Sequence, residues 1–183
     1  MKKILLLSII SLSFGTLFAQ SSTYWQQHVD YKMDVVMNVK NYQYKGKQEL
    51  VYSNNSSDTL KRVYYHLYNN AFQPGSEMDA RLQTIKDPDG RMVNKAKESR
   101  IKTLKPDEIG YLNVSNFKQD GVVANAKTVG TILEVTLAKP ILPHSKTTFS
   151  LDFDGQVPVQ IRRSGRNNAE GIELSMAQWY PKM

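Results

Sequence analysis

The sequence of 183 residues contains no cysteine. A fold without cysteine has no disulfide bonds and no thiolate ligands for a metal, so hydrophobic packing and hydrogen bonds must hold it together. An oxidising compartment permits disulfides but does not require them, so their absence leaves the cellular location open.

Histidine is also scarce, with three residues at His28, His66 and His144. None has a second histidine or a glutamate at ligand spacing, so the H-E-x-x-H pattern of a zinc helix is missing from this sequence. No serine lies in a G-x-S-x-G nucleophile turn either. We therefore interpret the histidines as polar surface or strand-edge residues, and we expect this chain by itself to bind no zinc tightly and to cleave no peptide.

The net charge of +7 is mildly basic. The basic residues are neither gathered into one stripe nor interleaved with aromatic residues, so the sequence gives no sign of a nucleic-acid partner. There are no internal repeats or low-complexity segments.

The only long hydrophobic run is at the N-terminus. Lys2 and Lys3 precede the mostly apolar stretch 4–18, which is short for a membrane span of about 20 residues. Ala19 is a small residue at the expected cleavage point. We interpret residues 1–19 as a secretory signal peptide, so that the mature protein begins at Gln20, is exported to the periplasm or the extracellular space, and is not inserted in the membrane. An uncleaved anchor is the alternative, because Leu17 is larger than is usual there.

Residues 20–183 are long enough for one domain with a sizeable core. Alternating apolar and polar residues predict strands, because successive side chains of a strand point to opposite faces. The clearest runs are 31–40, 44–53, 60–68, 131–139 and 147–153. With seven to eight short strands and almost no helix, the chain is predicted to be mainly β, as an antiparallel sandwich or a strongly curved sheet.

Two regions stand apart from these strands. Residues 71–104 lose the alternation and carry turn signals, so we expect a long excursion with at most a short helical turn near 95–100. The last residues, 172–183, again alternate and predict a final strand. In it, Gln178 interrupts an apolar row formed by Ile172, Leu174, Met176 and Tyr180.

Three further groups of residues are candidate sites. Asp152 and Asp154 flank Phe153 on one strand face and could hold a cation, although alternating acids on a solvated face are commoner. Arg162, Arg163 and Arg166 could clamp a carboxylate or phosphate, or could form a solvated loop. The ten tyrosines fit core and strand packing better than a sugar platform, but exposed aromatic residues leave a carbohydrate-binding module as a rival.

The segment Gly171-Ile-Glu-Leu-Ser-Met-Ala-Gln-Trp-Tyr-Pro-Lys182 resembles the aminopeptidase N-like zinc metallopeptidases, in the form common among secreted Bacteroidetes proteins. Supporting similarities lie at 31–35, 64–72 and 163–166. The resemblance covers residues 20–183 but only the N-terminal, saddle-shaped β domain of that family. It implies a zinc-dependent exopeptidase that removes amino-terminal residues, whose zinc site and general base would lie in a following catalytic domain that is absent here.

The same resemblance implies one site residue. In that family the β domain supplies a glutamate or glutamine that binds the free amino group of the peptide, and Gln178 falls at that place. The partners implied are a peptide substrate and the missing catalytic domain, with zinc as cofactor of the full-length protein. The alternative is a secreted β-sandwich module that binds or adheres to glycan or protein.

Overall fold

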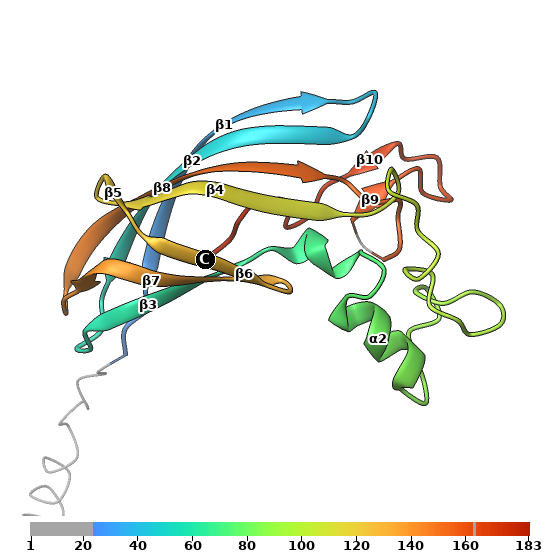
Figure 1. Ribbon diagram of the computed structural model, residues 1–183, viewed down its shortest axis with the longest axis horizontal. Helices are drawn as coiled ribbons and strands as arrows, with labels where there is room; N and C mark the ends of the chain where they lie inside the picture. The colour runs from blue at the N-terminus through green and yellow to red at the C-terminus, as the bar shows by residue number, and fades with distance from the viewer. Residues whose placement is uncertain (1–23, 163) are drawn as a thin grey trace, which may run out of the picture.

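The computed structural model describes residues 24–162 and 164–183, so the predicted signal peptide and Arg163 lie outside the described residues. Within this part the chain forms antiparallel sheets of five, three and two strands (Figure 1). The strand bounds are β1 (His28–Asn38), β2 (Gln43–Asn54), β3 (Leu60–His66), β4 (Tyr111–Gln119), β5 (Val122–Val123), β6 (Asn125–Val129), β7 (Ile132–Ile141), β8 (Ser145–Gln156), β9 (Gly165–Arg166) and β10 (Leu174–Ser175).

The five-stranded sheet has the order β1-β2-β8-β4-β5 and is built on a hairpin formed by the first two alternating runs. Tyr31 lies opposite Leu50 and Met37 opposite Tyr44, so the apolar residues of both strands share one face. β2 then pairs with β8 along its whole length. The alternation predicted for 147–153 is confirmed, because every second side chain of this run, from Thr147 to Phe153, is buried.

The three-stranded sheet, β3-β7-β6, packs against the inner face of the five-stranded sheet. Strands of the larger sheet curve over the smaller one (Figure 1). One core lies between them, and it includes Tyr44, Leu50, Phe149, Phe153, Val63, Tyr65, Leu133 and Val135. The prediction of a mainly β, antiparallel fold is therefore confirmed, with 48% strand and 8% helix in the part of the chain that the structure describes. The described residues form more strands than expected. The additional ones, β5, β9 and β10, have only two residues each, which is too short to show alternation in the sequence.

The excursion 71–104 is more ordered than the sequence analysis predicted. It follows the 3-10 helix η2 (Tyr68–Ala71) and contains an α-helix, α2 (Glu77–Thr84). The Ser76 hydroxyl accepts a hydrogen bond from the Asp79 backbone N–H at 3.2 Å, and the Asp79 carboxylate accepts one from Gly75 N–H at 2.9 Å. A serine followed by an acid three residues later is a signal for the start of a helix, which an alternating pattern does not reveal.

The expected helical turn near 95–100 is wrong. Val93 and Ser99 instead form an isolated antiparallel bridge. The residues between them turn back through Lys97, whose φ is +61°. Leu82, Met92 and Ile101 from this excursion form a second, smaller core with Ile161, which fixes α2 and its loops beside the sheets.

The expected final strand over 172–183 is also wrong. Only Leu174–Ser175 forms a strand, paired with Gly165–Arg166. Gly171 (φ +83°) and Gln178 (φ +56°) both adopt left-handed backbone conformations, which end an extended run. Past Gln178, Lys182 forms a backbone bridge with His66 at the end of β3, so the segment runs under the large sheet to the smaller one.

Gln48 provides a stability test of the core. It is 2% exposed, on the inner face of β2, and neither its amide nitrogen nor its amide oxygen has a hydrogen-bond partner among the described residues. A buried amide without partners costs about 1–3 kcal/mol. We therefore expect Gln48→Met, of similar length, to raise the free energy of unfolding by about 1–2 kcal/mol in urea denaturation. A lower value in the variant would indicate that a bound water satisfies the amide.

Candidate functional site

Gln178 lies in an irregular segment that is held in place on both sides. Upstream, the Ser164 hydroxyl donates to the Ser175 carbonyl at 3.1 Å and accepts from the Ala177 backbone N–H at 3.2 Å. Downstream, the Tyr44 hydroxyl donates to the Trp179 carbonyl at 2.6 Å. The backbone on each side of Gln178 is therefore fixed, although its own side chain is exposed.

Two aromatic rings of the five-stranded sheet, Tyr44 and Phe153, pack against this segment and are called the aromatic floor below. The Trp179 ring packs edge-on against Tyr44, with centroids 5.6 Å apart, and lies 6.2 Å from Phe153. Two glycines make room for these rings. A Cβ at Gly155 would lie 2.3 Å from the Tyr44 ring, and one at Gly46 would lie 2.3 Å from the Phe153 ring.

Tyr44 links the floor to the 3-10 helix. Its hydroxyl accepts a hydrogen bond from the Asn69 side-chain amide at 3.0 Å, and that amide also donates to the Gln156 carbonyl at 3.4 Å. Burial raises the pKa of Tyr44 well above its usual value, against the lowering effect of the Asn69 bond. The hydroxyl therefore remains protonated and can donate to the Trp179 carbonyl at any physiological pH.

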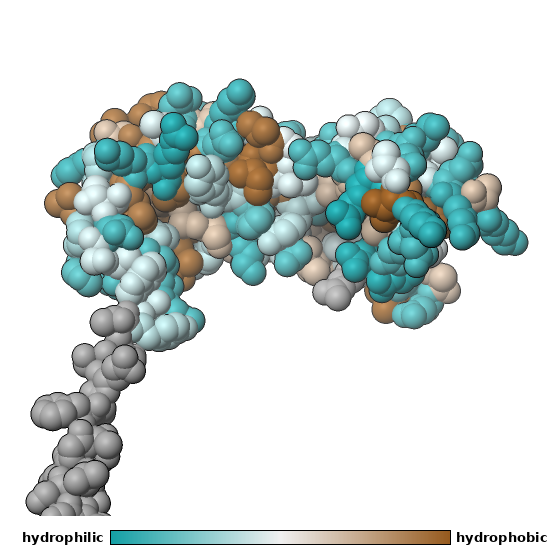
Figure 2. All heavy atoms as spheres, turned by 90° about the horizontal axis from the view of Figure 1, so that it is seen from below, coloured by the Kyte–Doolittle hydropathy of each residue, from teal (hydrophilic) through white to brown (hydrophobic). Residues whose placement is uncertain are grey.

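A cavity of about 460 Å³ opens beside Gln178. Its walls come from η2, the α2 region and the chain near β9 and β10, and they comprise Tyr68, Asn69, Ala71, Phe72, Met78, Met92, Arg162, Ser164, Ala177 and Gln178. Seen from below, the outline of the molecule is concave between the end that carries the sheets and the end that carries α2 (Figure 2). Among the described residues no hydrogen-bond partner of the Gln178 side chain is found, so its amide is free to bind a ligand.

The arginines at 162 and 166 do not converge into a clamp, and Arg163 is outside the described residues. Arg162 lines the cavity and pairs with Asp89, with Nε 3.3 Å from Oδ2. Arg166 instead lies 4.5 Å over the Tyr42 ring and donates to the Asp107 carbonyl. The alternative of a solvated loop holds in part, because the Arg162 side chain is 43% exposed, although both side chains also have protein partners.

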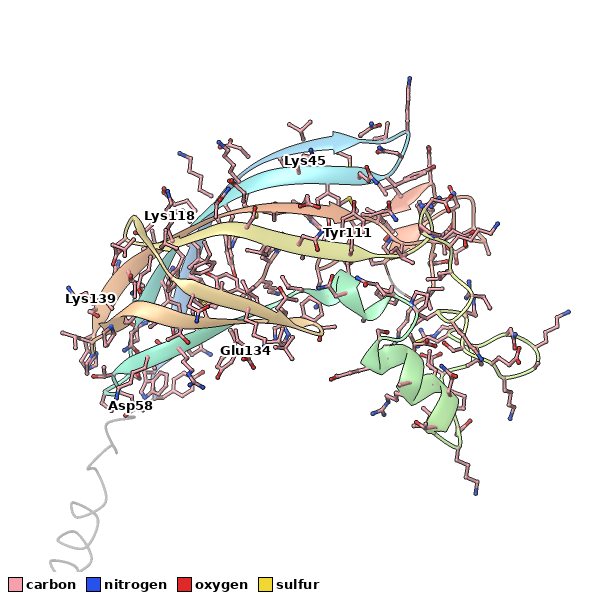
Figure 3. All side chains as sticks on the ribbon, viewed as in Figure 1. Lys45, Asp58, Tyr111, Lys118, Glu134 and Lys139 are labelled. Atoms are coloured by element: carbon pink, nitrogen blue, oxygen red, sulfur yellow. The ribbon has the colours of Figure 1, made fainter. Side chains whose placement is uncertain are left out.

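The acids at 152 and 154 lie on the outer face of the large sheet. Asp152 accepts a hydrogen bond from the Asn116 amide at 2.7 Å, and Asp154 accepts one from Asn113 at 3.1 Å. Lys45 is the cross-strand partner of Asp154 and, with Lys118, lies on this sheet (Figure 3). In the described part of the chain, no three histidine, aspartate, glutamate or cysteine side chains are grouped to hold a metal ion.

The histidines and tyrosines agree with the sequence interpretation. All three histidines are exposed; His66 stacks on Tyr68 with ring centroids 4.8 Å apart. Of the ten tyrosines, Tyr24 and Tyr64 are exposed, and the others are buried or half-buried in packing positions. Over residues 24–162 and 164–183, no helix is long and apolar enough to cross a membrane.

No protein-family model and no curated sequence matches this chain. Comparison with solved structures does find similar ones. Several of the matched structures are M1 zinc metallopeptidases. One, from Deinococcus radiodurans, has 16% sequence identity and a TM-score of 0.46 over 79% of this chain. Another, a two-domain M1 zinc metallopeptidase bound to L-arginine, has 16% identity and a TM-score of 0.47 over 83% of this chain.

A third structure, of a mutant of the Deinococcus radiodurans enzyme, holds a Tyr-Ser-Ala substrate and has the same identity and coverage as the first. These structures come from the family that the sequence motifs resemble. The chain spans only 25% of the length of the first and 27% of the second.

Proposed function

We propose that this chain is the N-terminal substrate-recognition domain of an exported zinc metallopeptidase that removes amino-terminal residues from peptides. The observation that carries the proposal is the placement of Gln178. The segment that resembles the aminopeptidase motif holds this residue on a fixed backbone at the edge of a cavity of about 460 Å³.

In this proposal the Gln178 side-chain oxygen accepts a hydrogen bond from the α-ammonium group of the peptide. A hydrogen bond to an ionised group contributes about 1.5–3 kcal/mol net. That corresponds to about 10- to 150-fold in binding. The residues described here do not fit a zinc ion, because a catalytic site needs three protein ligands. Zinc would therefore be held by the rest of the full-length protein, where it would polarise the scissile carbonyl.

The proposal is tested with the full-length protein and a matched pair of peptides, one with a free N-terminus and one with an acetylated N-terminus. We expect stepwise release of amino acids from the free peptide only, and loss of this release when a chelator removes zinc. Release from neither peptide, together with binding of a glycan, would instead favour the β-sandwich binding module.

A further inference from the structure

The cavity beside Gln178 has one apolar side. Phe72, Met78 and Met92 line it, and all three pack into the second core with Leu82, Ile101 and Ile161. Because these three side chains pack in that core, the apolar wall is held in place by the fold. Methionine side chains are unbranched and adjust to partners of different shape, so this wall suits apolar groups of several sizes.

The polar side of the cavity has few groups left to bind a ligand. The Asn69 amide is used by Tyr44 and Gln156, and the Ser164 hydroxyl is used by the segment that carries Gln178. Among the lining side chains this leaves the Gln178 amide, the Tyr68 hydroxyl, the Asn69 side-chain oxygen and the terminal nitrogens of Arg162, which is the only cation among them. None of the ten lining residues is acidic, so the cavity contains no carboxylate that could bind a cation.

Arg162 belongs to a small group of charged side chains in which positive charges outnumber negative ones. Asp89 is the carboxylate that pairs with Arg162, but it also binds Arg91, at 2.6 Å through Oδ2. One negative charge is thus shared between two guanidinium groups, and a net positive charge remains. The Arg162 side chain is 43% exposed, so its field is screened in part by solvent and salt.

We propose that this cavity receives the side chain of the first residue of the peptide, and that Arg162 makes it select uncharged apolar side chains over lysine and arginine. The inference rests on the proposed function, because Gln178 would hold the amino group at the cavity edge. The apolar wall accepts the hydrocarbon part of either kind of side chain. Arg162 repels only a side chain that ends in a cation.

The test measures the dissociation constants of norleucinamide and lysinamide for the full-length protein by calorimetry, with a zinc chelator present to prevent hydrolysis. The two ligands have side chains of nearly equal length, and lysine adds the ammonium group. At low ionic strength we expect norleucinamide to bind at least about tenfold more tightly. The ratio should fall as salt is added, because salt screens the repulsion.

Arg162→Gln should bring the ratio close to one, whereas Arg162→Lys, which keeps the charge, should preserve it. Lys118→Gln, which removes a charge from the large sheet outside the cavity, serves as the matched control and should leave the ratio unchanged. Equal binding of both ligands by the unaltered protein, an unchanged ratio in Arg162→Gln, or binding of neither ligand overturns the inference.

N-acetylnorleucinamide separates this inference from the proposed function. If acetylation leaves the affinity unchanged, the amine-anchoring role of Gln178 is wrong. The ratio between norleucinamide and lysinamide would still report on Arg162, so failure of one proposal can be distinguished from failure of the other.

Discussion

Gln178→Ala is expected to lower kcat/KM of the full-length protein for peptides with a free amino terminus by about tenfold or more. The substitution removes the acceptor for the substrate's α-ammonium group. It should change stability little, because the Gln178 side chain is exposed, and because glutamine and alanine must adopt the same left-handed backbone (φ +56°) at this position. The measurement is steady-state kinetics with a free and an acetylated peptide, alongside thermal unfolding of both proteins.

Gln178→Glu is the matched variant, because it keeps the acceptor and adds a negative charge. We expect it to preserve or raise activity on free-amine peptides and to increase the preference for them over acetylated ones. Two neighbours test whether another residue of this segment is the amine anchor. Glu173 accepts a weak hydrogen bond from Tyr42 at 3.4 Å, and Tyr180 packs on Tyr31. An unchanged kcat/KM in Gln178→Ala, with activity lost on substitution of either neighbour, would place the amine anchor elsewhere.

Gly155→Ala should lower the free energy of unfolding by about 2–4 kcal/mol. The added methyl group would lie 2.3 Å from the Tyr44 ring, which is buried and has no space to retreat without cost. Overpacking of this kind costs about 1–3 kcal/mol. Displacement of Tyr44 also weakens its hydroxyl's hydrogen bonds with the Trp179 carbonyl and the Asn69 amide, at about 0.5–1.5 kcal/mol each.

The same variant tests whether the aromatic floor positions Gln178. Gly90→Ala is the control, because a Cβ at Gly90 has no atom within 4 Å, and it should change stability by no more than about 0.5 kcal/mol. In the full-length protein, Gly155→Ala should also reduce kcat/KM at a temperature where the variant stays folded. Stability equal to that of Gly90→Ala would contradict the packing of Tyr44 on Gly155.

Where alternation was strong, the sequence was sufficient to predict strands. The runs that became β1, β2, β7 and β8 each bury one face against the common core, so the pattern of side chains follows directly from the fold. Alternation also gave the correct fold class. Alternation did not predict α2, because the signal for this helix is the N-cap pair Ser76 and Asp79 and not a periodic pattern.

The candidate site was likewise predicted only in part from the sequence. The motif around Gln178 was enough to single out that residue, but its alternating pattern predicted a strand that does not form. The backbone there is fixed by Tyr44, Ser164 and His66, which lie far away in the sequence. Arg162, Met78 and Met92 carried no local signal that they line one cavity.

The sequence by itself therefore determined the β class, because alternation depends on neighbours within a few positions, and its motif resemblance singled out the candidate residue. Only the tertiary structure decided that the final segment is irregular, that a second core supports α2, and that Gln178 and Arg162 share a cavity. These features depend on contacts between distant parts of the chain, such as the Tyr44 hydroxyl with the Trp179 carbonyl, whose geometry no local pattern encodes.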